Sequence, residues 1–145
     1  MEESLLPVEL YRNGPEHVYV RLASEEAVAA LRPDFGALTD LGIAASCFAG
    51  SGRSWKTRMF CPAAGVPEDA ATGSAAGPLA VHLARHGQIA FGEEIEIRQG
   101  EEIGRPSRLY ATATGEGDRI DAVEVGGRAV IVAEGRIRIA SDSSG

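Results

Sequence analysis

Short runs in which hydrophobic and polar residues alternate dominate the chain, and they predict β-strands. Val18, Val20 and Leu22 share one face, which we expect to be the buried face of a strand over residues 17–23. Four further runs of this kind are predicted to be strands: one around Ile95 and Ile97, one over residues 109–114, one around Val123 and Val125, and one around Ile137 and Ile139. Glycine-containing turns separate the runs. Short strands joined by tight turns favour antiparallel pairing over β-α-β crossovers.

Two or three helices interrupt the strand pattern. Ser24 is a suitable N-cap for a helix over residues 25–31, and residues 35–41 are a candidate for a second short helix. A third helix is predicted to begin near Thr72 and to end at Gly87. The third helix is apolar on nearly every side, so we expect it to be buried all round. Pro78 lies inside it and removes one helical hydrogen bond.

These elements predict an α+β fold, with a barrel-like, mostly antiparallel sheet wrapped around one central buried helix. The length of 145 residues fits a single domain over residues 1–145 with a real hydrophobic core. The net charge of −7 argues against nucleic acid or an anionic membrane as a partner. Cys47 and Cys61 lack C-x-x-C spacing, and the N-terminus has no basic start typical of a signal peptide. We therefore expect a cytoplasmic protein.

The richest chemistry lies just before the third helix. Asp69 is a candidate catalytic group, and Thr72, Gly73 and Ser74 are candidates to hold a substrate carboxylate with backbone N–H groups and a hydroxyl. The first turn of a helix leaves N–H groups unpaired and carries the positive end of the helix dipole. The structural alternative is that Asp69 and Thr72 only cap the helix or the preceding turn. Glu68 is expected to be a solvated neighbour of Asp69.

A family resemblance adds to this interpretation. The run E-D-A-A-T-G-S-A-A-G-P-L-A over residues 68–80, then Gln99-Gly100 and G-R-P-S over residues 104–107, resembles the PhzF-like proteins of phenazine biosynthesis. The similarity extends to residues 13–20 and 125–135. It implies a fold like that of diaminopimelate epimerase, with two similar domains and an active site in the cleft between them. This chain resembles the C-terminal domain alone.

The resemblance also implies a function. Family members isomerise small carboxylic acids without a cofactor by moving a proton, and the aspartate matched by Asp69 lies in their cleft. Their principal acid–base glutamate and an assisting histidine lie in the N-terminal domain and match nothing in this chain. We therefore expect an isomerase half-domain that needs an N-terminal half or a homodimer partner. The alternative is a non-catalytic module that binds a small carboxylate or natural product.

Other candidate sites are less favoured. Residues 50–57 nearly spell a phosphate-binding loop, but Trp55 stands where the second glycine is needed. His82 and His86 are spaced as metal ligands on one helix face, yet no third ligand is identifiable, so no metal site is expected. No histidine is expected beside Ser74, which argues against covalent catalysis. Cys61 is interpreted as a structural thiol.

The segment after the predicted strand around Ile95 and Ile97 is expected to have a structural role. Arg105 could face an anion, but with Pro106 and Ser107 it more simply fixes a turn and a domain contact. The sequence thus predicts the fold, a site at Asp69–Ser74 and a second half that completes the site.

Overall fold

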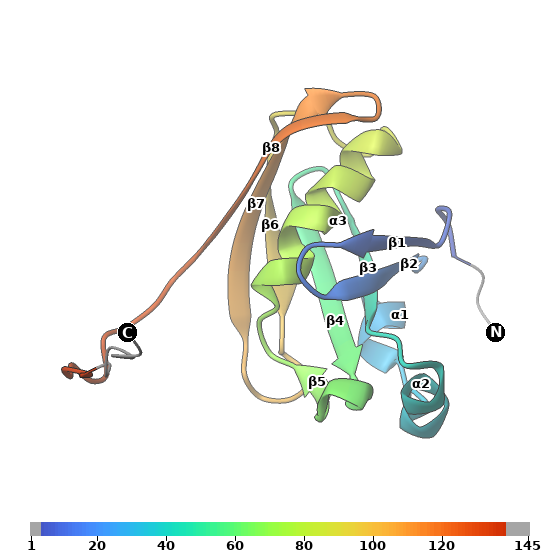
Figure 1. The fold of residues 1–145 in the computed structure, drawn as a ribbon. Helices are drawn as coiled ribbons and strands as arrows, with labels where there is room; N and C mark the ends of the chain where they lie inside the picture. The colour runs from blue at the N-terminus through green and yellow to red at the C-terminus, as the bar shows by residue number, and fades with distance from the viewer. Residues whose placement is uncertain (1–3, 139–145) are drawn as a thin grey trace, which may run out of the picture.

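The computed structural model describes residues 4–138, in which a curled sheet wraps around one central helix (Figure 1). The elements in chain order are β1 (Glu9–Arg12), β2 (Glu16–Arg21), α1 (Glu25–Ala30), α2 (Phe35–Leu41), β3 (Ala45–Ser51), β4 (Ser54–Cys61), a 3-10 turn (Pro62–Ala64), β5 (Val66–Asp69), α3 (Gly73–Arg85), β6 (Glu94–Gln99), β7 (Ser107–Glu116) and β8 (Arg119–Gly127). The strand order is β1-β2-β3-β4-β6-β7-β8, and β5 pairs with β4. None of the helices in residues 4–138 is long and apolar enough to span a membrane.

Most neighbouring strands are antiparallel, which confirms the predicted fold class. Two pairs, β2 with β3 and β4 with β6, are parallel. A parallel pair needs a crossover connection, and here the connections carry α1 and α2 in one case and β5 and α3 in the other. The expectation that the chain would contain no such crossovers is therefore wrong at these two places.

Helix α3 forms the centre of the core. Every residue from Ala75 to Ala84 is buried, and large side chains of the surrounding strands, such as Tyr19 and Trp55, are fully buried with it. Small residues let the sheet approach closely: a Cβ at Gly77 would lie 2.6 Å from Cγ1 of Val123. A fully buried large apolar side chain stabilises the fold by about 1.5–3 kcal/mol. The prediction of an all-round buried helix is confirmed.

The predicted helix boundaries also agree with the structure. Ser24 Oγ accepts a hydrogen bond from the backbone N–H of Ala27 at 3.1 Å, as an N-cap does. Thr72 occupies the N-cap position of α3, and Gly87 follows its end with φ +66°, a left-handed conformation that favours glycine.

The predicted burial of β2 is wrong. The strand forms, but His17 and Tyr19 point to α3 and are fully buried, whereas Val18 and Val20 are only half-buried. The sheet is covered on both faces here, because α1 packs against β3 and β4 on the outer side. The alternating apolar residues face this outer layer, and Leu22 joins its small cluster.

Several strands were not predicted, and one predicted strand is not found in the part of the chain that the structure describes. Residues 50–57 form the hairpin of β3 and β4, in agreement with the rejection of a phosphate-binding loop. The strand expected around residues 137–139 is not formed at 137 and 138, and Ile139 lies outside the described residues. Residues 128–138 instead extend away from the body of the domain (Figure 1).

Candidate functional site

The candidate site begins where β5 leads into α3. Asp69 ends β5, where it pairs with Met59 of β4. Its Oδ2 accepts a hydrogen bond from the Thr72 hydroxyl at 2.6 Å, and the Thr72 side chain makes no cap to the helix backbone. Asp69 therefore does not cap the helix backbone: its side chain bonds the Thr72 hydroxyl across the turn before α3, and the residue is partly exposed.

Gln99 holds this turn from behind. Its Nε2 donates to the carbonyl oxygen of Asp69 at 2.7 Å and to the Thr72 hydroxyl oxygen at 3.0 Å. Its Oε1 accepts from the Thr57 hydroxyl at 3.3 Å and from the backbone N–H of Thr72 at 3.4 Å. The side chain is 3% exposed. Sequence reasoning noted Gln99 only as part of a motif and did not find this clamp.

Gly100 allows the loop after β6 to approach the turn before α3 closely. A Cβ on this residue would lie 2.3 Å from the carbonyl oxygen of Arg105 and 2.8 Å from that of Ala70, and its φ of +81° is left-handed. Only glycine meets both conditions without strain. The motif residue is therefore needed to bring Gln99 against the turn before α3.

The start of α3 presents two backbone donors. The N–H groups of Gly73 and Ser74 have no hydrogen-bond acceptor among residues 4–138. The N–H groups of Ala75 and Ala76, in contrast, both donate to the Thr72 carbonyl oxygen at 3.1 Å. Unpaired N–H groups at the positive end of a helix attract an anion. Because the N–H and hydroxyl of Thr72 are already bonded, only Gly73 and Ser74 of the three predicted residues offer donors to a ligand.

Ser74 does have a histidine partner, contrary to the sequence-based expectation. Nε2 of His17 lies 3.1 Å from Ser74 Oγ, and burial lowers the pKa of His17, so the ring is neutral at pH 7. Its Nδ1 is buried without a partner in the described part of the chain. An unpaired buried N–H is rarer than an unpaired acceptor, so we place the proton on Nε2, which donates to Ser74 Oγ.

This tautomer decides what Ser74 can do. The hydroxyl oxygen accepts from His17, and its own proton is left to donate to a ligand. A serine nucleophile needs the opposite arrangement, with a basic histidine nitrogen facing the hydroxyl and a third group orienting the ring. The expectation against covalent catalysis therefore remains, although its stated reason is wrong.

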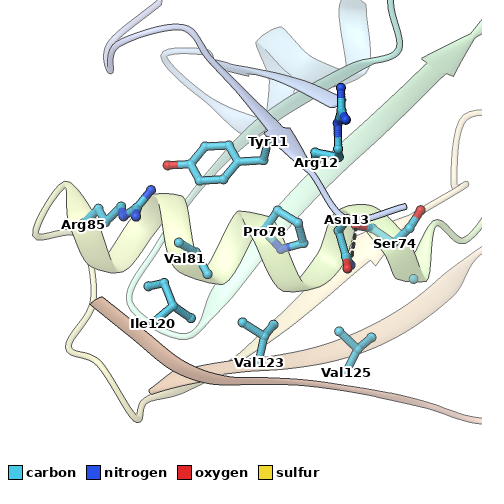
Figure 2. Close-up of a pocket in the computed structure, with 11 residues that line it drawn as sticks. Tyr11, Arg12, Asn13, Ser74, Pro78, Val81, Arg85, Ile120, Val123 and Val125 are labelled. Carbon is cyan, nitrogen blue, oxygen red and sulfur yellow. Dashed lines mark hydrogen bonds between the residues drawn. The ribbon is translucent and has the colours of Figure 1, made fainter. Parts of the chain in front are cut away.

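An open groove runs along α3 from this point. It has a volume of about 550 Å³ and lies between the two edges of the sheet (Figure 2). Its lining comes from β1 and the following turn, from α3 and from β8: Tyr11, Arg12, Asn13, Gly73, Ser74, Pro78, Val81, Arg85, Ile120, Val123 and Val125. Gly73 and Ser74 thus open onto the groove, whereas Asp69 and Thr72 are not among its lining residues.

Pro78 has a specific consequence in this groove. Proline cannot donate to the carbonyl oxygen four residues earlier, which is that of Ser74. Asn13 Nδ2 donates to this oxygen instead at 3.2 Å (Figure 2). The β1–β2 turn is thereby attached to the first turn of α3.

Glu68 is not the solvated neighbour that was expected. Its carboxylate forms a two-pronged ion pair with Arg58, at 2.9 Å from Nε and 2.8 Å from Nη2, and both side chains are almost fully buried. Arg58 also donates to the carbonyl oxygens of Ala29 and Leu31 at the end of α1. Glu68 is therefore committed to structure, and Asp69 is the carboxylate at the helix start.

Two further residues behave as expected. The backbone N–H of Arg105 donates to the Gly100 carbonyl at 2.9 Å, and its carbonyl oxygen accepts from the Ser107 hydroxyl at 3.2 Å, which fixes the predicted turn. Cys61 is half-buried against the core. Burial, aided by the charge of Asp69, raises the pKa of the Cys61 thiol, which therefore stays protonated.

The histidine pair on α3 has a third potential ligand that the sequence did not reveal. Glu9 of β1 lies beside His82 and His86, and one ligand atom from each residue falls within 4.8 Å of the others. The expectation of no metal site was based on the lack of a third ligand, and this reason is therefore wrong.

Comparison with known proteins places this architecture among relatives. A family model described as phenazine biosynthesis-like protein matches residues 1–135. The chain is 61% identical over 137 residues to a trans-2,3-dihydro-3-hydroxyanthranilate isomerase of Pseudomonas aeruginosa, covering 94% of this chain and 49% of the relative. It is 32% identical to the uncharacterized isomerase YddE of Escherichia coli, covering 88% of this chain and 46% of that protein. The chain thus spans about half the length of the curated relatives it matches.

Solved structures agree on the fold. A phenazine biosynthesis protein of the PhzF family from Bacillus anthracis superposes with a TM-score of 0.74 at 20% identity, covering 92% of this chain and 49% of that one. A PhzC/PhzF protein from Clostridium difficile gives a TM-score of 0.62 at 24% identity, with 94% and 49% covered.

Proposed function

Because this chain belongs to the phenazine biosynthesis-like protein family, we propose that it supplies one half of a cofactor-independent isomerase site that moves a proton on a small carboxylic acid. One observation carries the proposal. The start of α3 offers the unbonded N–H groups of Gly73 and Ser74 beside the Asp69 carboxyl, which Thr72 holds in place. An anion-binding helix terminus next to an acid–base group is what proton transfer beside a carboxylate requires.

Each residue then has a role. Gly73 and Ser74 bind the substrate carboxylate through their N–H groups, and the Ser74 hydroxyl, oriented by His17, adds a third donor. Asp69 accepts or donates a hydrogen bond, or the moving proton, through the carboxyl oxygen that Thr72 leaves unoccupied. Gln99 and Thr72 do not touch the substrate and act as positioning residues.

We further propose that a second half completes the cleft. The groove along α3 lies between the outer strands β1 and β8, and Val123 and Val125 in it are 41% and 44% exposed. The extended segment 128–138 exposes a larger set of apolar side chains, by 83–91%: Val130, Ile131, Val132 and Ile137. Exposed apolar surface and unpaired strand edges favour association. The partner is either a complementary N-terminal half, in the same polypeptide or separate, or a second copy of this chain.

Reconstitution tests the isomerase proposal. The chain would be co-expressed with the N-terminal half of the 61% identical relative, and conversion of trans-2,3-dihydro-3-hydroxyanthranilate would be followed by absorbance. We expect turnover that Asp69→Asn reduces by about 10²–10⁴-fold. Asp40→Asn, at an exposed position on α2, is the matched control and should leave the rate unchanged. If Asp69→Asn leaves the turnover of an assembled complex unchanged, the acid–base role assigned to Asp69 is refuted.

Light scattering on the chain alone tests the second-copy version. Association into a dimer at micromolar concentration supports symmetrical pairing, and a strictly monomeric species removes it. A complementary half would then be the remaining partner.

The alternative function is a binding module for a small carboxylate without turnover. The observation that favours it is that both N–H donors are in place within this chain by itself. Calorimetry with anthranilate-like acids on the isolated chain, compared with Asp69→Asn, distinguishes the two. The binding-module function is supported if Asp69→Asn weakens binding and no partner half gives the protein any turnover.

A further inference from the structure

A separate cluster of side chains lies toward the other end of α3. Glu9 Oε2 is 3.1 Å from His82 Nδ1 and 3.2 Å from His86 Nε2, and the three potential ligand atoms all fall within 4.8 Å of one another. Ser74 and His86 are twelve residues apart on one helix, which corresponds to about 18 Å. We propose that Glu9, His82 and His86 bind a divalent transition-metal ion of the zinc type, at a site distinct from the one at the start of the helix.

The geometry suits such an ion. Tetrahedral zinc with bonds of about 2.0–2.1 Å separates neighbouring ligand atoms by about 3.3 Å, close to the distances from Glu9 to the two histidines. Two histidines and one carboxylate leave a fourth position for water. Glu9 and His86 are partly exposed while His82 is fully buried, so the ion would enter from the solvent side.

Tyr11 supports the cluster as an outer partner. Its hydroxyl donates to Glu9 Oε2 at 2.6 Å and lies 3.4 Å from His82 Nδ1. A hydrogen bond to a ligating carboxylate orients it for the metal.

Two features limit the affinity. Arg85 lies over the Tyr11 ring at 5.8 Å, and the charge of Arg21 also acts on His82, so positive charge is already near the site. His82 Nε2 has no partner among residues 4–138 to fix the ring from outside. We therefore expect binding weaker than that of closed structural zinc sites.

The competing explanation is a hydrogen-bonded cluster that only ties β1 to α3. Calorimetric titration of the purified chain with Zn²⁺ separates the two. We expect one ion per chain, affinity reduced at least tenfold in His86→Gln and in Glu9→Gln, and a Tm that rises by about 5–10 °C when free Zn²⁺ exceeds Kd a hundredfold. Glu16→Gln, an exposed glutamate on the neighbouring strand, is the matched control and should bind as the unmodified chain does.

A Cys47→Ser/Cys61→Ser variant excludes the thiols as the source of binding. His86 is partly exposed, so His86→Gln should fold, which circular dichroism verifies. The proposal is overturned if no stoichiometric binding occurs, if the folded His86→Gln variant binds undiminished, or if binding disappears with the cysteines.

Discussion

Replacing Gln99 with methionine tests how the Asp69 turn is held. Methionine has nearly the same length but neither donor nor acceptor of comparable strength. The substitution removes two short hydrogen bonds, to the Asp69 carbonyl at 2.7 Å and the Thr72 hydroxyl at 3.0 Å, and two longer ones. It also leaves the buried Thr57 hydroxyl without this partner.

The magnitude follows from these four bonds. A typical internal hydrogen bond contributes about 1 kcal/mol net, and an unsatisfied buried polar group costs about 1–3 kcal/mol. Since two of the bonds are long, we expect Gln99→Met to lower the free energy of unfolding by about 2–3 kcal/mol. In a protein of this size that corresponds to a Tm lower by about 4–12 °C.

Urea denaturation followed by circular dichroism measures the loss, with an unchanged m-value indicating an unchanged native fold. Gln88→Met is the control, because Gln88 is only half-buried and makes two bonds instead of four: its Nε2 donates to the His86 carbonyl at 3.1 Å, and its Oε1 accepts from Nη1 of Arg21. We expect the control to lose about 1 kcal/mol. If Gln99→Met loses no more than Gln88→Met, the clamp does not hold the turn and the reasoning fails.

Three further predictions concern stability. Glu68→Leu should lower the free energy of unfolding in urea by about 3–5 kcal/mol, because it leaves Arg58 buried and unpaired, and the Arg58→Met/Glu68→Leu double variant should recover part of the loss; equal losses would contradict this. Gly100→Ala should lose about 2 kcal/mol or more, whereas Gly104→Ala, with φ +69° but open space around it, should lose only the smaller backbone strain; the reverse order would refute the close-approach argument. The folded-state pKa of Glu9 is lowered from 4.5 to about 2, so it contributes stability that is present above pH 4.5 and lost as the pH falls toward 2; Glu9→Gln should flatten the unfolding free energy across that window, and an unaltered pH profile would count against the cluster.

Local sequence predicted those parts of the molecule that depend on local physics. The start and end of α3, the cap at Ser24 and the buried faces of β6 and β7 all follow from periodicity and capping within a few residues. The inverted face of β2 did not follow. Alternation shows that two faces differ, but it does not say which one meets the central helix when both are covered.

The parts that escaped prediction depend on contacts between distant residues. His17 meets Ser74 across 57 positions, Gln99 meets Thr72 across 27, and Glu9 meets His82 across 73. The short β1 strand that carries Glu9 offers only a weak pattern of its own. Without the sheet order, no local signal brings these side chains together, which is why the third potential metal ligand was missed.

The candidate site is divided between this chain and its proposed partner. The groups that orient Asp69 and Ser74, namely Thr72, Gln99 and His17, are all buried inside this domain. Positioning on this side is therefore independent of any partner, whereas the face onto which the Gly73 and Ser74 donors open is an open groove. A partner half needs only to cover that face and add a second acid–base group. Substrate affinity should consequently survive in part in the isolated chain, while turnover should appear only in the complex, so binding and catalysis can be measured separately.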